Sequence, residues 1–174
     1  MTLTKKNNLS IRLISIILAL ITAISAFSLT NGVAMAASKT PATAYSAVKK
    51  SYGKSFPFSA KNRVKGKRRV MGVKTADLSS YYAASKITGG KNSKCEYIIM
   101  VAKVKSKGKV SSVKSQLSKF KNNEESSMKN YLSSKGKKLF KNAKVGSVGS
   151  FVYIVMIDTN GNKKAVKAIK KALG

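Results

Sequence analysis

The chain has 174 residues, of which 35 are Lys or Arg, 5 are Asp or Glu and none is His, so its formal net charge is +30. The absence of His excludes His-based triads, His-ligated zinc and imidazole chemistry near neutral pH, and a single Cys excludes an internal disulfide. With 43% hydrophobic residues, the chain can still close a core, and its length predicts one domain.

The first 36 residues follow the order of a secretory signal. The positive end consists of Lys5, Lys6 and Arg12, and an apolar segment follows at residues 13–27. Ala34-Met35-Ala36 then forms a small-x-small cleavage motif. An uncleaved membrane anchor is the alternative, since the apolar region nearly reaches the length of a bilayer span, but Asn31-Gly32 interrupts it. We therefore expect cleavage after Ala36 and a secreted or cell-wall-associated mature domain over residues 37–174.

Two helices and a short strand are predicted in the first half of the mature chain. Thr40 and Pro41 supply an N-cap and a first-turn proline for a helix over residues 41–52. A short strand at residues 70–73 and a brief helix at residues 76–84 are expected to follow.

The most apolar stretch of the mature chain, residues 96–104, is typical of a buried central strand. Cys95 at its start is interpreted as a small buried hydrophobe, with an intermolecular disulfide as the alternative. Apolar residues recurring at three- and four-residue steps then predict one long amphipathic helix, which begins at Val110 and ends within residues 133–136.

Two apolar runs flank Gly149-Ser150 and predict a β-hairpin, and a last helix is expected over residues 162–173. The predicted order is therefore α-β-α-β-α-β-β-α. Strands this few and this unevenly spaced do not fit a doubly wound parallel sheet. The expected fold class is α+β, with a small antiparallel sheet and helices packed on one face of it.

Several short motifs occur in an order that resembles a known family. Near the N-terminus there are a Tyr-Gly and a Phe-Pro pair (residues 52–57), and a Tyr-Leu pair follows at residues 131–132. A Lys-Asn-Ala-Lys sequence (residues 141–145) precedes an apolar strand after a Gly turn (residues 149–155), and a terminal helix closes the pattern (residues 167–173). In this order the chain resembles an uncharacterised domain common in exported proteins and lipoproteins of Firmicutes. The resemblance implies the fold class and export, and it transfers no activity, cofactor or catalytic residue. This chain departs from the family by lacking a lipobox Cys and by being so rich in Lys.

Three of the 35 cations lie in the predicted signal, so the mature chain keeps 32 cations against 5 acids, a net charge of +27. A small soluble domain needs a net charge of only about 2–8, and the excess costs stability through self-repulsion. The basic residues are densest in residues 61–69 and on one face of the last helix. From these two groups come the candidate polyanion-binding residues Lys61, Arg63, Lys65, Lys67, Arg68, Arg69, Lys163, Lys164, Lys167 and Lys171.

We hypothesise that the protein binds an anionic polymer outside the cell, such as wall or lipoteichoic phosphate polymer. Extracellular nucleic acid and an anionic membrane surface are other candidates. Lys contacts would displace condensed counterions without reading a sequence, and 31 Lys against 4 Arg suits point-charge attraction to phosphate. One alternative is that the lysines only solvate the domain. Another is a small protein or peptide interaction module, acting through Tyr81-Tyr82 or through the edge of residues 151–157.

The sequence contains no strong enzymatic motif. The side chains of Glu124 and Glu125 would point about 100° apart on a helix, the other acids are scattered, and there is no Gly-x-Ser-x-Gly or Gly-rich phosphate loop. A Ser–Lys dyad is left open, because the chain is rich in both residue types. We expect a non-enzymatic domain with no catalytic residue, no metal and no cofactor.

Overall fold

The structure, a computed structural model, describes residues 38–174, and the predicted signal peptide with its cleavage site at Ala36 lies outside them. This part of the chain has four α-helices, one two-stranded sheet and one four-stranded sheet, with all strand pairs antiparallel. Among these residues, no helix has both the length and the apolar character to cross a membrane. The α+β class with a small antiparallel sheet is confirmed.

The main sheet has the strand order β3-β4-β6-β5. Its strands are β3 (Leu78–Thr88), β4 (Cys95–Val104), β5 (Lys144–Val148) and β6 (Phe151–Met156). The central strand predicted from the apolar run is β4, and β5 and β6 form the hairpin predicted at Gly149-Ser150. The small sheet pairs β1 (Arg69–Val70) with β2 (Val73–Lys74), so residues 70–73 form a tight turn instead of a single strand.

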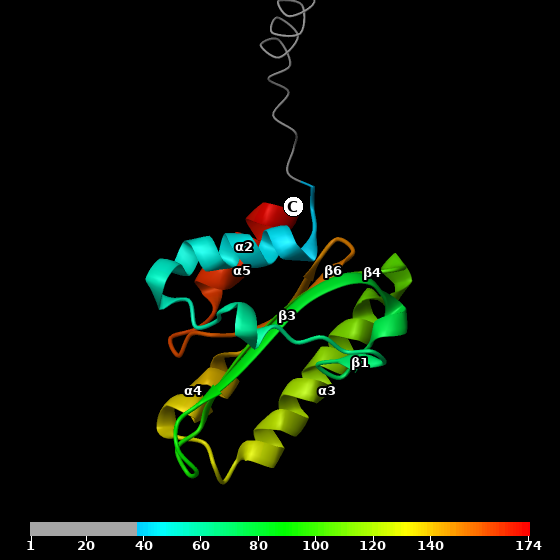
Figure 1. The fold of residues 1–174 in the computed structure, drawn as a ribbon. Helices are drawn as coiled ribbons and strands as arrows, with labels where there is room; N and C mark the ends of the chain where they lie inside the picture. The colour runs from blue at the N-terminus through cyan, green and yellow to red at the C-terminus, as the bar shows by residue number, and fades with distance from the viewer. Residues whose placement is uncertain (1–37) are drawn as a thin grey trace, which may run out of the picture. The chain divides into compact units, whose positions relative to one another are not determined.

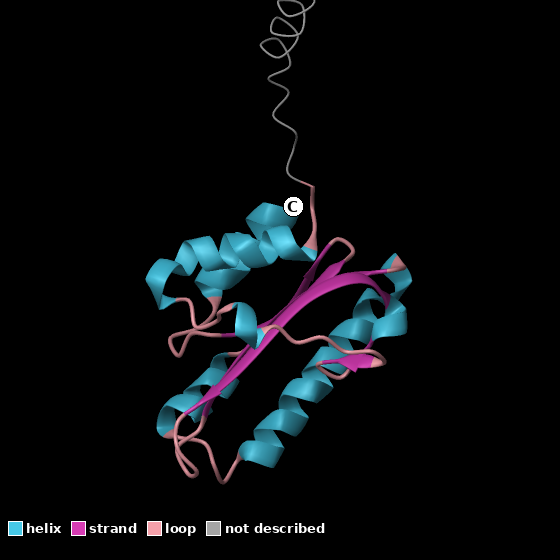
Figure 2. Ribbon diagram, viewed as in Figure 1, coloured by secondary structure: helices cyan, strands magenta, loops and turns pink. Residues whose placement is uncertain are grey.

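Helices cover both faces of the main sheet (Figures 1 and 2). They are α2 (Pro41–Tyr52), α3 (Val110–Met128), α4 (Ser134–Asn142) and α5 (Lys163–Leu173). Helices α3 and α4 pack on the face that carries Ile98 and Met100, whereas α2 and α5 pack on the face that carries Ile99 and Val101. The prediction of helices on one face is wrong, because alternate residues of a continuous apolar strand point to opposite faces and each face needs a cover.

The brief helix predicted at residues 76–84 is also wrong, since most of this segment lies in β3. A β-bulge between Leu78 and Ser80 shifts the register of the strand. As a result Leu78 and Tyr81, three residues apart, both pack against the core on the α3 side, while Tyr82 packs on the α2 side. Because of the bulge, the apolar residues Leu78 and Tyr81 of this strand have the three-residue spacing that is typical of a helix.

The long helix predicted to reach residues 133–136 ends at Met128, and α4 is a separate helix. Its N-cap is Ser133, whose hydroxyl accepts a hydrogen bond from the Gly136 N–H at 3.0 Å. The linker between the helices docks on the strand start: the Lys94 N–H donates to the Tyr131 carbonyl at 2.7 Å, and the Ser133 N–H donates to the Lys94 carbonyl at 3.0 Å. A Cβ on Gly136 would lie 2.4 Å from that Lys94 oxygen, so glycine permits the close approach.

The terminal helices agree with the sequence prediction. Thr40 caps α2 by accepting from the Thr43 N–H at 3.1 Å, while the Thr43 hydroxyl accepts from the Thr40 N–H at 2.9 Å. In α5, Ala165 and Ile169 are buried and the Lys residues are exposed. Cys95 is buried, as expected of a small hydrophobe in this position.

Asn162 fixes the turn that joins β6 to α5. Its side chain is fully buried, and its Oδ1 accepts from the N–H groups of Ile157 and Asp158 at 3.0 and 3.2 Å. Its Nδ2 donates to the Asn142 carbonyl at 2.8 Å, and the Asn142 side chain donates in turn to the Thr159 carbonyl. The turn is therefore tied to the end of α4.

Replacing Asn162→Ala is expected to lower the free energy of unfolding by about 2–3 kcal/mol, because it leaves buried backbone groups without partners. The control is Asn160→Ala in the same turn, where the side chain is exposed, and it should cost less than about 0.5 kcal/mol. Urea denaturation measures both. Equal losses in the two variants would show that the buried amide does not hold the turn.

Glu96 on β4 is a carboxyl group inside the core, with only 5% of the residue exposed. One of its oxygens accepts from the Ser85 hydroxyl at 3.1 Å, and the other has no hydrogen-bond partner in the described structure. Burial, with a smaller contribution from the negative charge of Glu124 on α3, raises the pKa of Glu96 from 4.5 to about 7. Between these two pH values the folded state holds a proton that the unfolded chain releases, so stability falls as the pH rises through this window.

Replacing Glu96→Gln is expected to raise the free energy of unfolding at about pH 8 by roughly 1–3 kcal/mol. Near pH 4.5 it should change little, because a neutral amide resembles the protonated acid. The control is Glu125→Gln, which removes a half-exposed acid paired with Lys121 and should not flatten the pH dependence. Urea titrations at both pH values test this, and an equal gain at the two would contradict the assignment to ionisation.

Candidate functional site

The basic segment, residues 61–69, runs along the outer edge of β3. Arg63 forms an antiparallel bridge with Ala84, and the Val64 N–H donates to the Ala83 carbonyl at 2.9 Å. Because side chains alternate along extended backbone, Val64 packs against the core while Arg63 and Lys65 are exposed. The segment thus covers part of a sheet edge and presents its cations outward.

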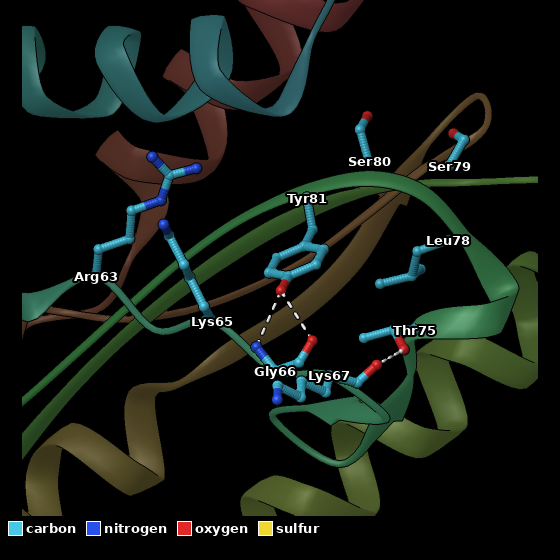
Figure 3. A pocket seen from close by; sticks show the side chains of 9 residues that line it. All are labelled: Arg63, Lys65, Gly66, Lys67, Thr75, Leu78, Ser79, Ser80 and Tyr81. Carbon is cyan, nitrogen blue, oxygen red and sulfur yellow. Dashed lines mark hydrogen bonds between the residues drawn. The ribbon is translucent and has the colours of Figure 1, made fainter.

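A cavity of about 690 Å³ opens between this segment and the start of β3 (Figure 3). We call it the β3-edge pocket, and its lining consists of Arg63, Lys65, Gly66, Lys67, Thr75, Leu78, Ser79, Ser80 and Tyr81. Figure 3 shows Arg63 and Lys65 on one side, Ser79 and Ser80 on the other, and Tyr81 between them. Cations and hydroxyl side chains thus line the same cavity, and none of the nine lining residues is acidic.

Hydrogen bonds from the walls hold the basic segment in place. The Tyr81 hydroxyl accepts from the Gly66 N–H at 3.0 Å and donates to the Gly66 carbonyl at 3.3 Å. A Cβ on Gly66 would lie 1.8 Å from the Arg69 carbonyl oxygen, so the turn that follows requires glycine. The Thr75 hydroxyl donates to the Lys67 carbonyl at 2.8 Å. These contacts fix the backbone, and the Arg63 guanidinium lies over the Tyr82 ring, 4.6 Å from its centroid.

The β-bulge places two serines side by side on the opposite wall. Both Ser79 and Ser80 are exposed, although they are neighbours in a strand. The Ser79 hydroxyl donates to the Lys103 carbonyl at 3.1 Å. Within residues 38–174 the ion pairs are Lys109–Asp77 and Lys121–Glu125, so no cation of the pocket is neutralised by a nearby acid.

The ten residues predicted for polyanion binding do not form one site. Arg63, Lys65 and Lys67 line the β3-edge pocket. Arg69 donates to the Gly72 carbonyl at 2.8 Å and so belongs to the β1-β2 turn. Lys61, Arg68 and Lys163 are exposed but lie outside the cavity linings.

Lys164, Lys167 and Lys171 line a separate groove between α2 and α5. Lys50 of α2 adds a fourth cation, and the rest of the lining is Ala47, Ser51, Ala168 and Ala172. We call this the α5 groove. It shares no residue with the β3-edge pocket, so the two basic groups act as separate surfaces.

Sequence reasoning found the cations of the pocket and missed its hydroxyl groups. Thr75, Ser79, Ser80 and Tyr81 fall in or beside the segment predicted as a helix. The adjacent Ser79-Ser80 pair would have been the available signal, since a bulged edge strand exposes two neighbouring polar residues.

Of the surfaces predicted for an interaction module, Tyr81, Tyr82 and strand β6 have partners within the domain, whereas β5, the other strand of the hairpin, forms an edge of the main sheet. Tyr81 binds Gly66, and Tyr82 stacks on Tyr45 with ring centroids 4.0 Å apart. The run at residues 151–157 has no free edge, because β6 pairs with β4 on one side and β5 on the other. Among residues 38–174, no three Cys, Asp or Glu side chains gather to form a metal site.

A family model described as a domain of unknown function (DUF4358) matches residues 61–157. The matched range begins in the basic segment and ends after β6, so it contains the β3-edge pocket, the main sheet, α3 and α4. No curated protein and no solved structure matches the chain. A match to an uncharacterised domain is what the motif order predicted.

Replacing Tyr81→Phe is expected to release Gly66 and to lower the free energy of unfolding by about 1 kcal/mol, through the loss of two hydrogen bonds at one hydroxyl. Hydrogen exchange at the Gly66 amide should become faster by tenfold or more. The matched control is Tyr131→Phe, at a ring that is 43% exposed, which should leave that exchange unchanged. Unaltered protection in Tyr81→Phe would show that the clamp is not formed in solution.

Proposed function

Because the chain belongs to the family of the domain of unknown function DUF4358, which has no activity to transfer, we propose its function from its own surface. It is an exported, non-enzymatic domain that binds anionic polymers at the cell surface, with wall phosphate polymer as the main ligand. The observation that carries this proposal is the β3-edge pocket, where three cations that form no ion pair within residues 38–174 share a cavity with hydroxyl side chains and no acid.

The distribution of the acids strengthens the electrostatic case. Asp77 and Glu125 are paired with lysines, and Glu96 is buried with a raised pKa. The surface cations therefore repel one another with little internal relief. A polyanion reduces this repulsion and releases its own condensed counterions when it binds.

The arrangement of the pocket suits a linear polymer. Arg63 and Lys65 are two residues apart in extended chain, a spacing of about 6.6 Å, so the cations form a row. Lys offers a point charge to phosphate, whereas Arg can contact two oxygens at once. On the facing wall the Ser80 hydroxyl can donate to a phosphate oxygen, whereas the Ser79 oxygen can accept from a hydroxyl group of a polyol phosphate chain. Such contacts favour a polymer with regularly spaced negative charges and do not recognise a particular sequence of units.

Replacing Arg63, Lys65 and Lys67 together by Gln is expected to weaken binding to purified wall teichoic acid at least tenfold. The slope of log K against log salt should fall by about 2–3, roughly one for each lost phosphate contact. The control replaces Lys107, Lys119 and Lys138 by Gln, which removes the same charge from exposed positions outside both basic cavities. It should weaken binding less than threefold. Calorimetric titrations over a range of sodium chloride concentrations measure both triple variants.

The outcomes separate the ligand from the site. Wild-type binding that does not change with salt contradicts polyanion capture altogether. Equal losses in the two triple variants contradict the pocket as the site, while leaving polymer binding intact. Duplex DNA and phosphatidylglycerol vesicles serve as competing ligands, and tighter binding of either at equal salt would contradict wall polymer as the main ligand.

A further inference from the structure

A second polar cavity, of about 290 Å³, lies where the end of α2, β4, the start of α4 and the end of β6 meet. Tyr52, Tyr97, Lys135, Asp158 and Thr159 line it, and we call it the α4–β6 pocket. It shares no residue with the β3-edge pocket or the α5 groove. Its volume is near the lower end for ligand pockets, about 300 Å³, so it suits a molecule of few heavy atoms.

The α4–β6 pocket has one charge of each sign, and the two are not paired with each other. Neither Lys135 nor Asp158 takes part in the ion pairs found within residues 38–174. One Asp158 oxygen accepts from the Asn160 N–H at 2.8 Å, and the Tyr52 hydroxyl is a hydrogen-bonding neighbour of the same carboxylate. Hydrogen bonding to the Tyr97 hydroxyl raises the pKa of Lys135, so its ammonium is held in the charged form. Both residues line the cavity, so both charges can contact a ligand.

The Tyr52 hydroxyl adds a further hydrogen-bonding group to the same cavity. Its oxygen is buried and forms no short hydrogen bond within the described residues, and the Asp158 carboxylate and the Ala165 backbone act on it as hydrogen-bonding neighbours. Burial raises the pKa of Tyr52 to about 12, and the negative charge of Asp158 adds to this effect, so the hydroxyl keeps its proton. The hydrogen bonding of this buried hydroxyl is therefore incomplete, and a polar ligand in the pocket would complete it.

Both charges are carried by backbone that is held in place. Asn162 accepts from the Asp158 N–H and from the residue before it, which fixes the turn after β6. Lys135 lies in the first turn of α4, whose cap, Ser133, hydrogen-bonds to the start of β4. Charges on anchored backbone are preorganised for a ligand.

We propose that the α4–β6 pocket binds a small zwitterion of the size of a free amino acid. The ligand carboxylate lies at Lys135, its ammonium lies at Asp158, and the Tyr52 hydroxyl supplies a further hydrogen bond. A ligand with a single charge would leave one of the two protein charges unmatched, so the pocket favours a molecule that carries both. This goes beyond polyanion binding and does not depend on it.

The test titrates the purified protein with glycine, both enantiomers of alanine and γ-aminobutyrate, which differ in charge separation. Acetate and ethylammonium at matched ionic strength are the single-charge probes. We expect at least one zwitterion to bind saturably and at least tenfold more tightly than either single-charge probe. Asp158→Asn and Lys135→Gln should each weaken that binding tenfold or more, because each removes a charge-assisted hydrogen bond.

The control variant is Lys138→Gln, on the same helix but outside the lining, and it should bind within twofold of the wild type. Asp158→Asn keeps the size of the side chain and an acceptor for Asn160, so an unchanged melting temperature will show that the turn is intact. Absence of saturable binding by every zwitterion would overturn the proposal. So would acetate or ethylammonium binding as tightly as the best zwitterion.

Discussion

The burial of β4 and β6 on both faces is the constraint on which the rest of the structure depends. Ile98 and Ile99, adjacent in β4, lie in different cores, one against α3 and α4 and the other against α2 and α5. With a single Cys, the domain has no internal disulfide, so hydrophobic burial must oppose the self-repulsion of its charge. Two helical layers over one short sheet provide that burial and leave the charged residues on the outside of the helices and at the sheet edges.

The sheet edge explains why the basic segment lies where it does. An exposed edge strand presents unpaired backbone groups that another chain could join, and charged residues are a common protection. Residues 61–69 cover part of the β3 edge with backbone contacts and place Arg63, Lys65 and Lys67 over it. The same segment therefore serves two purposes, since the cations that discourage strand pairing also form one wall of a cavity. The β-bulge contributes the other wall by turning two neighbouring serines outward.

The sequence predicted correctly those helices and strands that are determined by residues close together in the chain. The Thr40 cap, the apolar run of β4 and the hairpin turn at Gly149 all depend on nearby residues, and these elements were found. β3 was missed because its bulge sets Leu78 and Tyr81 at helical spacing, a feature decided by pairing with a strand far along the chain. α4 was merged into α3 because the break between them depends on docking to Lys94. Charge density located the cations of the pocket, whereas its hydroxyls could be placed only once the β3 fold was known.

In a chain with five acids against 35 cations, the position of each acid is informative. Asp77 and Glu125 form ion pairs, and Glu96 and Glu124 lie near each other at the core. Asp158 differs from these four, because it lines a cavity together with a lysine and pairs with no cation. Lys residues are so abundant that an acid would readily find one if its turn could move. The hydrogen bonds of Asn162 hold the backbone of that turn, and the Asp158 carboxylate and the Lys135 ammonium line one cavity without forming an ion pair within residues 38–174.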